Sequence, residues 1–264
     1  MLIEISLGIA VGLVMALTGA GGGILAVPLL AFGAGLDVGE AAPIGLIAVG
    51  IAAALGAALG LRVGQVRYRA ALLMAVLGML MAPVGVALSR RFDQRWLGVL
   101  FAIVLLYVAY RAFVEATKTH ADEEEKRDAV CMRNEATGRF VWTGSCTRSL
   151  AMSGSIAGLL SGLLGVGGGF VMVPALKRTT DLPMQAIVPT SLAVIALVSV
   201  AGVVSSALSK GIDWGVAIPF ASGALGGMLV GRMIAAYLPA AGMQKGFGTV
   251  SALVAVGMVA KSLA

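Results

Sequence analysis

The sequence predicts an all-helical protein that crosses a membrane several times, and three observations lead to this fold class. Apolar residues make up 59% of the 264 residues, charged residues only 12%, and the mean hydropathy is +0.99. Because a soluble domain is about 25% charged, this chain lacks the polar surface that would cover its core in water. Its few charges lie between long charge-free runs, and its first half recurs in its second half.

Eight charge-free runs are candidates for transmembrane segments. A helix needs about 20 apolar residues to cross a bilayer, and basic residues at the ends of a shorter run can extend it by snorkelling. The first run lacks the positively charged start of a signal peptide, so we expect it in the mature protein. The eight runs are Ile5 to Leu36, Ala41 to Leu61, Ala70 to Ser89, Trp96 to Tyr110, Ser149 to Leu176, Leu182 to Ser209, Trp214 to Gly231, and Gly246 to Ala260.

The two halves of the chain match at a fixed offset of 146 residues. We interpret residues 1–115 as a first transmembrane repeat of four segments, residues 116–147 as a hydrophilic linker, and residues 148–264 as a second repeat. Internal repeats of this kind are common in secondary transporters. Matched residues include Gly8 with Gly154, Gly12 with Gly158, Val27 with Val173, Pro28 with Pro174, and Pro43 with Pro189.

The linker is strongly polar. Residues 122–128 are all charged, which indicates a solvated segment, and residues 138–143 are compatible with a short strand or hairpin. The sole histidine, His120, lies near the acids, and the two cysteines, Cys131 and Cys146, form no CxxC motif. These residues give no indication of a metal site.

A glycine-rich motif occurs once in each repeat, as Gly19-Ala-Gly-Gly-Gly-Ile-Leu-Ala-Val-Pro28 and Gly165-Val-Gly-Gly-Gly-Phe-Val-Met-Val-Pro174. Each glycine costs a helix about 1 kcal/mol relative to alanine, and proline has no backbone N–H group. The motif therefore predicts broken or re-entrant helices. Free N–H groups at the start of a half-helix attract anions. We expect an anion site between the repeats, formed by Gly21, Gly22, Gly23 and Pro28 with Gly167, Gly168, Gly169 and Pro174.

The alternative is that these glycines only allow close packing between helices. The recurrence of the motif at matched positions, each time with its Val-Pro, favours the binding site. Neither copy is a nucleotide-binding loop, because the Lys-Ser/Thr pair of a P-loop is missing from both.

A second matched pair lies at the start of the next run, Pro43-Ile-Gly45-Leu and Pro189-Thr-Ser191-Leu. Thr190 and Ser191 supply two hydroxyl groups that either cap a helix start or face a substrate, whereas the first copy has no hydroxyl. Thr18 and Ser161, before the glycine turns, are weaker candidates, since hydroxyl groups within spans commonly bond back to their own helix.

The centres of the runs contain no ionisable residue. Proton relays, carboxylate cation sites and the catalytic groups of intramembrane proteases therefore have no carriers, so we expect neither an enzyme nor a cofactor or metal. Although the net charge is +6, the basic residues flank the runs or lie in the linker, and we expect lipid and a small anion as partners, not nucleic acid.

Orientation depends on the linker. If every run crosses the membrane once, Lys and Arg number 12 on the side of the termini and the linker and 7 on the other side, or 5 and 7 without the linker. This count favours both termini in the cytoplasm. Four crossings per repeat imply parallel repeats, whereas a re-entrant first segment in each half implies inverted ones.

The doubled G-x-G-G-G-x-x-x-V-P motif, the Pro-Thr-Ser-Leu sequence and the hydrophilic linker resemble the TauE/SafE family of membrane permeases, also called the 4-toluene sulfonate uptake permease family. The resemblance implies seven or eight spans in the bacterial inner membrane and transport of small sulfur-containing anions such as sulfite or organosulfonates. It assigns the two glycine motifs to the family's repeat motif and Thr190 and Ser191 to its Thr-Ser pair, from which Ile44 and Gly45 depart in the first half.

We therefore expect a secondary transporter of a small anion that works by alternating access of its two repeats. Two alternatives stay open. One is a passive anion channel, and the other is a non-transporting membrane scaffold or partner subunit. The scaffold would be favoured if the two glycine turns lay far apart with no polar cavity between them.

Overall fold

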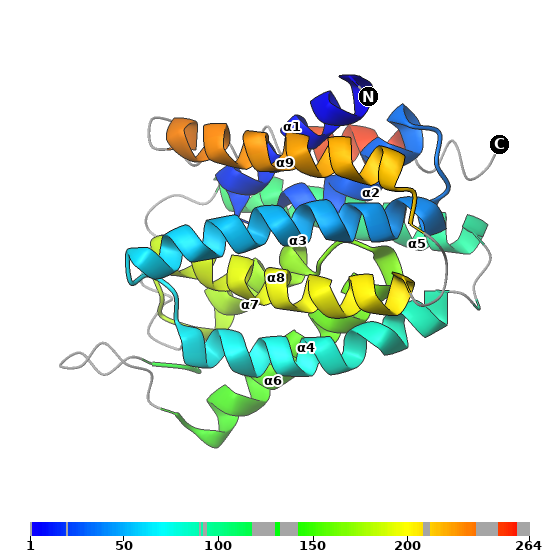
Figure 1. Ribbon diagram of the computed structural model, residues 1–264. Helices are drawn as coiled ribbons and strands as arrows, with labels where there is room; N and C mark the ends of the chain where they lie inside the picture. The colour runs from blue at the N-terminus through cyan, green and yellow to red at the C-terminus, as the bar shows by residue number, and fades with distance from the viewer. Residues whose placement is uncertain are drawn as a thin grey trace.

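The computed structural model describes residues 2–19, 21–89, 91, 94–117, 130–132, 142–207, 212–235 and 248–257. These residues form ten helices and no strand (Figure 1). The helices are α1 (Leu2–Thr18), α2 (Gly21–Gly33), α3 (Val38–Arg62), α4 (Tyr68–Ser89), α5 (Gln94–Thr117), α6 (Gly144–Leu164), α7 (Gly169–Thr179), α8 (Met184–Ala207), α9 (Trp214–Ala235) and a tenth helix, Gly248–Gly257.

Each glycine motif interrupts the charge-free run that contains it. The break between α1 and α2 and the break between α6 and α7 both fall within a motif. Gly19, Gly165, Gly167 and Gly168 have φ angles of +77°, +72°, +74° and +70°, which residues with a Cβ adopt only at a cost. The first and fifth runs therefore form two helices each, and the helix breaks predicted from the motif are present.

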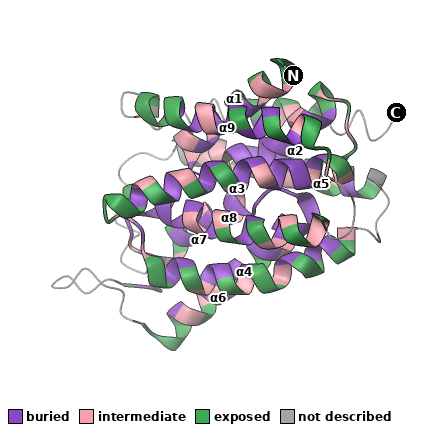
Figure 2. Ribbon diagram, in the orientation of Figure 1, coloured by how far each residue is buried: buried purple, intermediate pink, exposed green. Residues whose placement is uncertain are grey.

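Five of the described helices are long and apolar enough to cross a membrane: α3, α4, α8, α9 and the Trp96–Val114 part of α5. Helices α1, α2 and Gly248–Gly257 are apolar but shorter. Exposed residues lie on the outer surfaces of the long helices (Figure 2). The large apolar residues that are exposed include Leu72, Leu80, Ile218 and Leu229. Such a surface suits contact with lipid chains.

Helix boundaries recur at the sequence offset. Helices α4 and α9 both begin and end 146 residues apart, and α3 and α8 begin 146 residues apart. Residues that match in the two halves thus form helices with matching bounds.

The helices pack as two bundles, each of which contains helices from both halves of the chain. In the first bundle α1, α2 and α3 pack with α9, and in the second α6, α7 and α8 pack with α4. In Figure 1 the first bundle lies above the second. There are two clusters of buried apolar side chains. The one containing Val11 and Phe220 extends from the first bundle to Leu163 of α6 and Ile195 of α8, and the one containing Met74 and Leu150 lies in the second bundle. Helices α4 and α9 are therefore exchanged between the halves.

Glycines bring the exchanged helices into close contact. A Cβ atom on Gly8 would collide with Phe220 O of α9, and one on Gly12 would collide with Ala224 O. Because the contacts advance in the same direction along both helices, α1 and α9 are parallel. Small residues at such interfaces are typical of membrane helices. The matched contacts between α6 and α4 are Gly154 with Met74, Gly158 with Gly78 and Gly162 with Ala82.

Helices α3 and α8 join the two bundles and are antiparallel. Gly50 faces Ser199, and Gly60, further along α3, faces Pro189, which lies earlier in α8. Since α3 and α8 are equivalent in the sequence repeat, a rotation that superposes them must reverse the helix direction. Its axis is perpendicular to both helices.

The start of α1 and the described ends of the linker lie at opposite ends of the molecule (Figure 1). A Cβ on Gly22 would approach Met15 N within 2.5 Å, and one on Gly33, at the far end of α2, would collide with the Leu7 side chain. Helix α2 therefore runs back along α1. The expectation that the N-terminus and the linker share a side is wrong, because the glycine turn reverses the chain before α3.

The linker is attached where α6 begins and α7 ends. A disulfide joins Cys131 to Cys146, with Cα atoms 4.9 Å apart. The Cys131 N–H donates to Thr179 O at 2.8 Å, and the Thr143 hydroxyl oxygen caps α6 by accepting from the Cys146 N–H at 3.2 Å. The charged run, His120 and residues 138–141 of the expected strand lie outside the described residues.

Candidate anion-binding site

The first glycine turn is wedged between α1 and α8. The Gly19 N–H donates to Met15 O at 2.8 Å, which ends α1. A Cβ on Gly19 would lie 2.7 Å from the Val188 side chain, and one on Gly22 would press against α1. Both Gly22 and Gly23 are buried. Gly19 and Gly22 therefore leave no room for a side chain at their positions.

The second turn has three glycines in left-handed conformations, Gly165, Gly167 and Gly168. Gly168 is the N-cap of α7, and its carbonyl accepts from the Val171 N–H at 3.1 Å. A Cβ on Gly168 would lie 2.5 Å from Ala157 O of α6. Both backbone angle and space therefore require glycine where α7 starts.

The two turns meet halfway along α3 and α8. A Cβ on Gly23, in the first motif, would lie 2.6 Å from Val166 O, in the second motif. The Val49 side chain, in the middle of α3, lies 3.3 Å from that position and 3.1 Å from a Cβ built on Gly167. Ile195, in the middle of α8, also lies 3.1 Å from Gly167 on this measure. We call Gly23, Val166, Gly167 and the residues that they touch the glycine junction.

Two half-helices begin at the glycine junction and run away from it. Helix α2 runs to Gly33 at the end where α1 starts, and α7 runs to Thr179 beside Cys131 of the linker. The first N–H groups of a helix have no partner within it, and the helix dipole places about half a positive charge there. Both half-helices therefore start close to the junction, and the anion site expected there stays a prediction.

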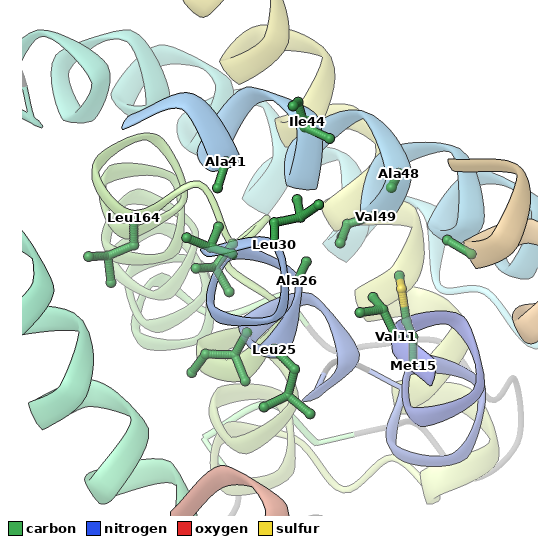
Figure 3. Close-up of a cluster of buried hydrophobic side chains, with 14 of the residues drawn as sticks. Val11, Met15, Leu25, Ala26, Leu30, Ala41, Ile44, Ala48, Val49 and Leu164 are labelled. Atoms are coloured by element: carbon green, nitrogen blue, oxygen red, sulfur yellow. The ribbon is translucent and has the colours of Figure 1, made fainter. Parts of the chain in front are cut away.

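Helix α2 is enclosed by its neighbours. In Figure 3, Val11 and Met15 of α1 and Ala41 and Ile44 of α3 surround α2, which carries Leu25, Ala26 and Leu30. Pro28 is buried within α2, and Pro174 is half-buried within α7. The prolines thus lie inside the half-helices, five residues beyond the last glycine of each motif.

The two hydroxyl groups expected beside a substrate are bonded within the protein. Thr190 donates to Ala186 O at 2.6 Å and accepts from the Arg67 N–H at 3.1 Å. Ser191 donates to Val188 O at 2.8 Å and lies 3.4 Å from Gly19 O. Thr190 thus ties α8 to the turn between α3 and α4, while Ser191 lies against the first glycine turn.

Residues 5–258 match the family model described as sulfite exporter TauE/SafE. The chain belongs to this family. It is a multi-pass membrane transporter of the TauE/SafE family, and no solved structure matches it.

Relatives over most of the chain are also named as transporters. A probable membrane transporter protein of Xylella fastidiosa (strain 9a5c) is 28% identical over 269 residues, which cover 100% of this chain and 97% of the relative. The probable membrane transporter protein YunE of Bacillus subtilis (strain 168) is 28% identical over 242 residues, covering 88% of this chain and 87% of the relative. Neither name specifies a substrate.

Replacing Thr190 by valine in this TauE/SafE protein is expected to reduce stability. The change leaves the part-buried Arg67 N–H without its partner, which costs on the order of 1 kcal/mol. The measurement is thermal unfolding in detergent, with Ser153→Ala as the control, because Ser153 only donates to Ser149 O of its own helix. An unchanged melting temperature together with a loss of anion flux would instead place Thr190 in the binding site.

Two buried serines in this TauE/SafE transporter have hydroxyl groups without a hydrogen-bond partner near the break regions. Ser161 precedes the second turn, and Ser199 lies in α8. Ser161 is a weak candidate from the sequence alone, whereas sequence reasoning missed Ser199. The one available signal was the repeat, in which Ser199 matches Ala53. Among the described residues, no three His, Cys, Asp or Glu side chains form a group that could hold a metal ion.

Proposed function

We propose that this protein is a secondary transporter of a small anion, with a sulfur-containing oxyanion such as sulfite or an organosulfonate as its substrate. The observation that carries this proposal is the meeting of two half-helix starts at the glycine junction, halfway along α3 and α8. Broken helices whose N-termini face an anionic group are a recurring device of transporters. The family's description, sulfite exporter, supports the sulfur oxyanion.

Neutral donors suit this substrate. Backbone N–H groups at helix starts bind oxyanions without a charged side chain. The described acidic residues of the helices lie in their first or last turns, away from the junction. No described carboxylate therefore lies at the junction, where the acceptor is the Val166 carbonyl oxygen beside Gly23.

Alternating access follows from two bodies that can rock against each other. We propose that these bodies are the two bundles, which touch mainly along α3 and α8. With α3 and α8 across the bilayer, the axis relating the repeats 1–115 and 148–264 lies in the membrane plane. The repeats are then inverted, the arrangement in which one structure can open to either side.

The rivals make different predictions. A channel would conduct anions without saturation, and a scaffold would not move them at all. Contact between the two glycine turns favours a shared site over two separate packing motifs.

The test is flux of radiolabelled sulfite and sulfoacetate into proteoliposomes that contain the purified protein. We expect the uptake to be saturable and to become faster when unlabelled anion is present on the opposite side of the membrane. Empty liposomes provide the control. Conductance without saturation would establish the channel, and flux at the level of empty liposomes for both anions would contradict the transporter.

We propose the bacterial inner membrane as the location, with the linker in the cytoplasm. Described Lys and Arg residues at the linker end of the bundles outnumber those at the other end, which are Arg91 and Arg95. The basic side of short loops is cytoplasmic. The disulfide indicates the reverse, since disulfides persist in oxidising compartments. We give the charges more weight because they occur in several loops. The residues at the linker end are Arg62, Arg67, Arg69, Arg111, Arg148, Lys177, Arg178 and Arg232.

Sided labelling of thiols measures this orientation. In intact spheroplasts, a membrane-impermeant maleimide is expected to leave Gly64→Cys unlabelled and to label Gly35→Cys, in a background without Cys131 and Cys146. Both glycines lie in turns with open space around them, at opposite ends of α3. The opposite labelling pattern would place the start of α1 in the cytoplasm and the linker outside.

A further inference from the structure

We propose that the Ser199 hydroxyl donates a hydrogen bond to the transported oxyanion at the glycine junction. This inference rests on the proposed function and assigns one side chain of the binding site. It makes the site asymmetric, because the matching residue of the first half is Ala53.

Ser199 lies at the junction by geometry. Its Oγ atom is 3.4 Å from a Cβ built on Gly167 and 3.6 Å from one built on Gly50. The hydroxyl thus faces the space left open by two glycines, one in the second turn and one in the middle of α3. Ser199 is only 1% exposed.

The hydroxyl of Ser199 is unusual among those in the described helices. Ser and Thr inside helices usually donate to a carbonyl three or four residues earlier, and Thr190, Ser191 and Ser222 do so here. Ser199 Oγ has no hydrogen-bond partner. A buried donor without a partner is a cost to the folded protein, and a bound ligand that accepts the bond removes that cost.

The chemistry of the surroundings defines the ligand. The half-helix starts supply neutral N–H donors, Ser199 supplies an O–H donor, and the Val49 and Ile195 side chains beside Gly167 are apolar. These donors and apolar side chains suit a small, partly dehydrated oxyanion. The oxyanion accepts the Ser199 proton as a hydrogen bond, and no covalent step is required.

Ser199→Ala tests the assignment, with Ser251→Ala as the matched control. Ser251 is also buried and has no hydrogen-bond partner, but it lies on helix Gly248–Gly257, whose ends contact Phe113 and Phe32. The probes are radiolabelled sulfite and sulfoacetate in proteoliposomes. We expect Ser199→Ala to raise the KM of the transported anion by about tenfold to a hundredfold, as for loss of a hydrogen bond to a charged group, with little change in maximal rate and none in Ser251→Ala.

Thermal unfolding separates a binding role from a structural one. Removing an unsatisfied hydroxyl is expected to leave the melting temperature of Ser199→Ala unchanged or higher, and sulfite is expected to stabilise the wild type more than the variant. A lower melting temperature without ligand, or a KM equal to that of Ser251→Ala, would overturn the assignment while the transporter stands. If the wild-type protein transports neither anion, both the proposed function and this role of Ser199 are wrong.

Discussion

A disulfide between α3 and α8 is expected to stop anion transport, because it locks the two bundles together. Gly60 and Pro189 face each other across this interface, with a Cβ on Gly60 placed against the Cβ of Pro189. The pair Gly60→Cys and Pro189→Cys therefore lies within reach of a disulfide, whose Cβ atoms are about 3.8 Å apart. Oxidation is expected to lower the flux by about tenfold or more, because it blocks the conformational change that limits the transport rate. Reduction of the disulfide is expected to restore the flux.

The control is a disulfide inside one bundle. A Cβ on Gly78 of α4 would lie 2.7 Å from the Val198 side chain of α8, within the second bundle. The pair Gly78→Cys and Val198→Cys, also without Cys131 and Cys146, is expected to keep its flux when oxidised. Equal inhibition by both disulfides, or by neither, would mean that the two bundles are not the moving bodies.

Gly168→Ala is expected to abolish most of the transport while the protein still folds. The added methyl group meets Ala157 O at 2.5 Å in a residue whose φ is +70°. The turn must shift to make room, and a displacement of about 1 Å in groups that position a reactant can cost a hundredfold in rate. Flux assays measure the loss of transport, with wild type and variant compared as samples of equal monodispersity.

Two other glycines separate the effect of backbone strain from that of packing. Gly35 and Gly64 have φ angles of +68° and +73°, yet a Cβ at either position would have nothing within 4 Å. Gly35→Ala and Gly64→Ala carry the same backbone strain, about 1 to 2 kcal/mol, and are expected to transport normally. If they lose flux as Gly168→Ala does, general strain and not the shape of the junction is responsible.

The sequence predicts the helix breaks well because their cause is local. The glycines Gly19, Gly165, Gly167 and Gly168 have no Cβ that would disfavour left-handed backbone, so each break falls at its glycine-rich motif, whereas Gly21 to Gly23 begin α2. The long apolar helices are equally predictable from the sequence, since their length is set by the thickness of the bilayer. The family match over residues 5–258 agrees with the duplicated motif.

Chain direction and helix partners could not be predicted in this way. Whether a glycine turn continues a helix or reverses it depends on contacts such as Gly22 against α1, which have no local signature. The exchange of α4 and α9 depends on which distant backbone approaches Gly8 and Gly154. The count of basic residues has the same limit, because it assumed one crossing per run.

The hydroxyl groups show the same limit at the level of single side chains. Thr190 and Ser191 stand out in the sequence because they follow a proline in a duplicated motif, yet both bond within the protein. Ser199 lies in an unremarkable apolar stretch. Only the approach of Gly50 and Gly167 identifies it, and residues far apart in sequence make that approach.

The exchange of α4 and α9 also constrains biogenesis. During synthesis, α1 enters the membrane without the helix against which its glycines pack, because α9 ends only at Ala235. Neither half can complete its own bundle. The glycine-rich faces of the first half therefore stay exposed in the bilayer until the second half has been made. Contacts this distant in sequence are slow to form and leave intermediates exposed. Separately expressed halves should therefore be degraded alone and stabilised when they are produced together.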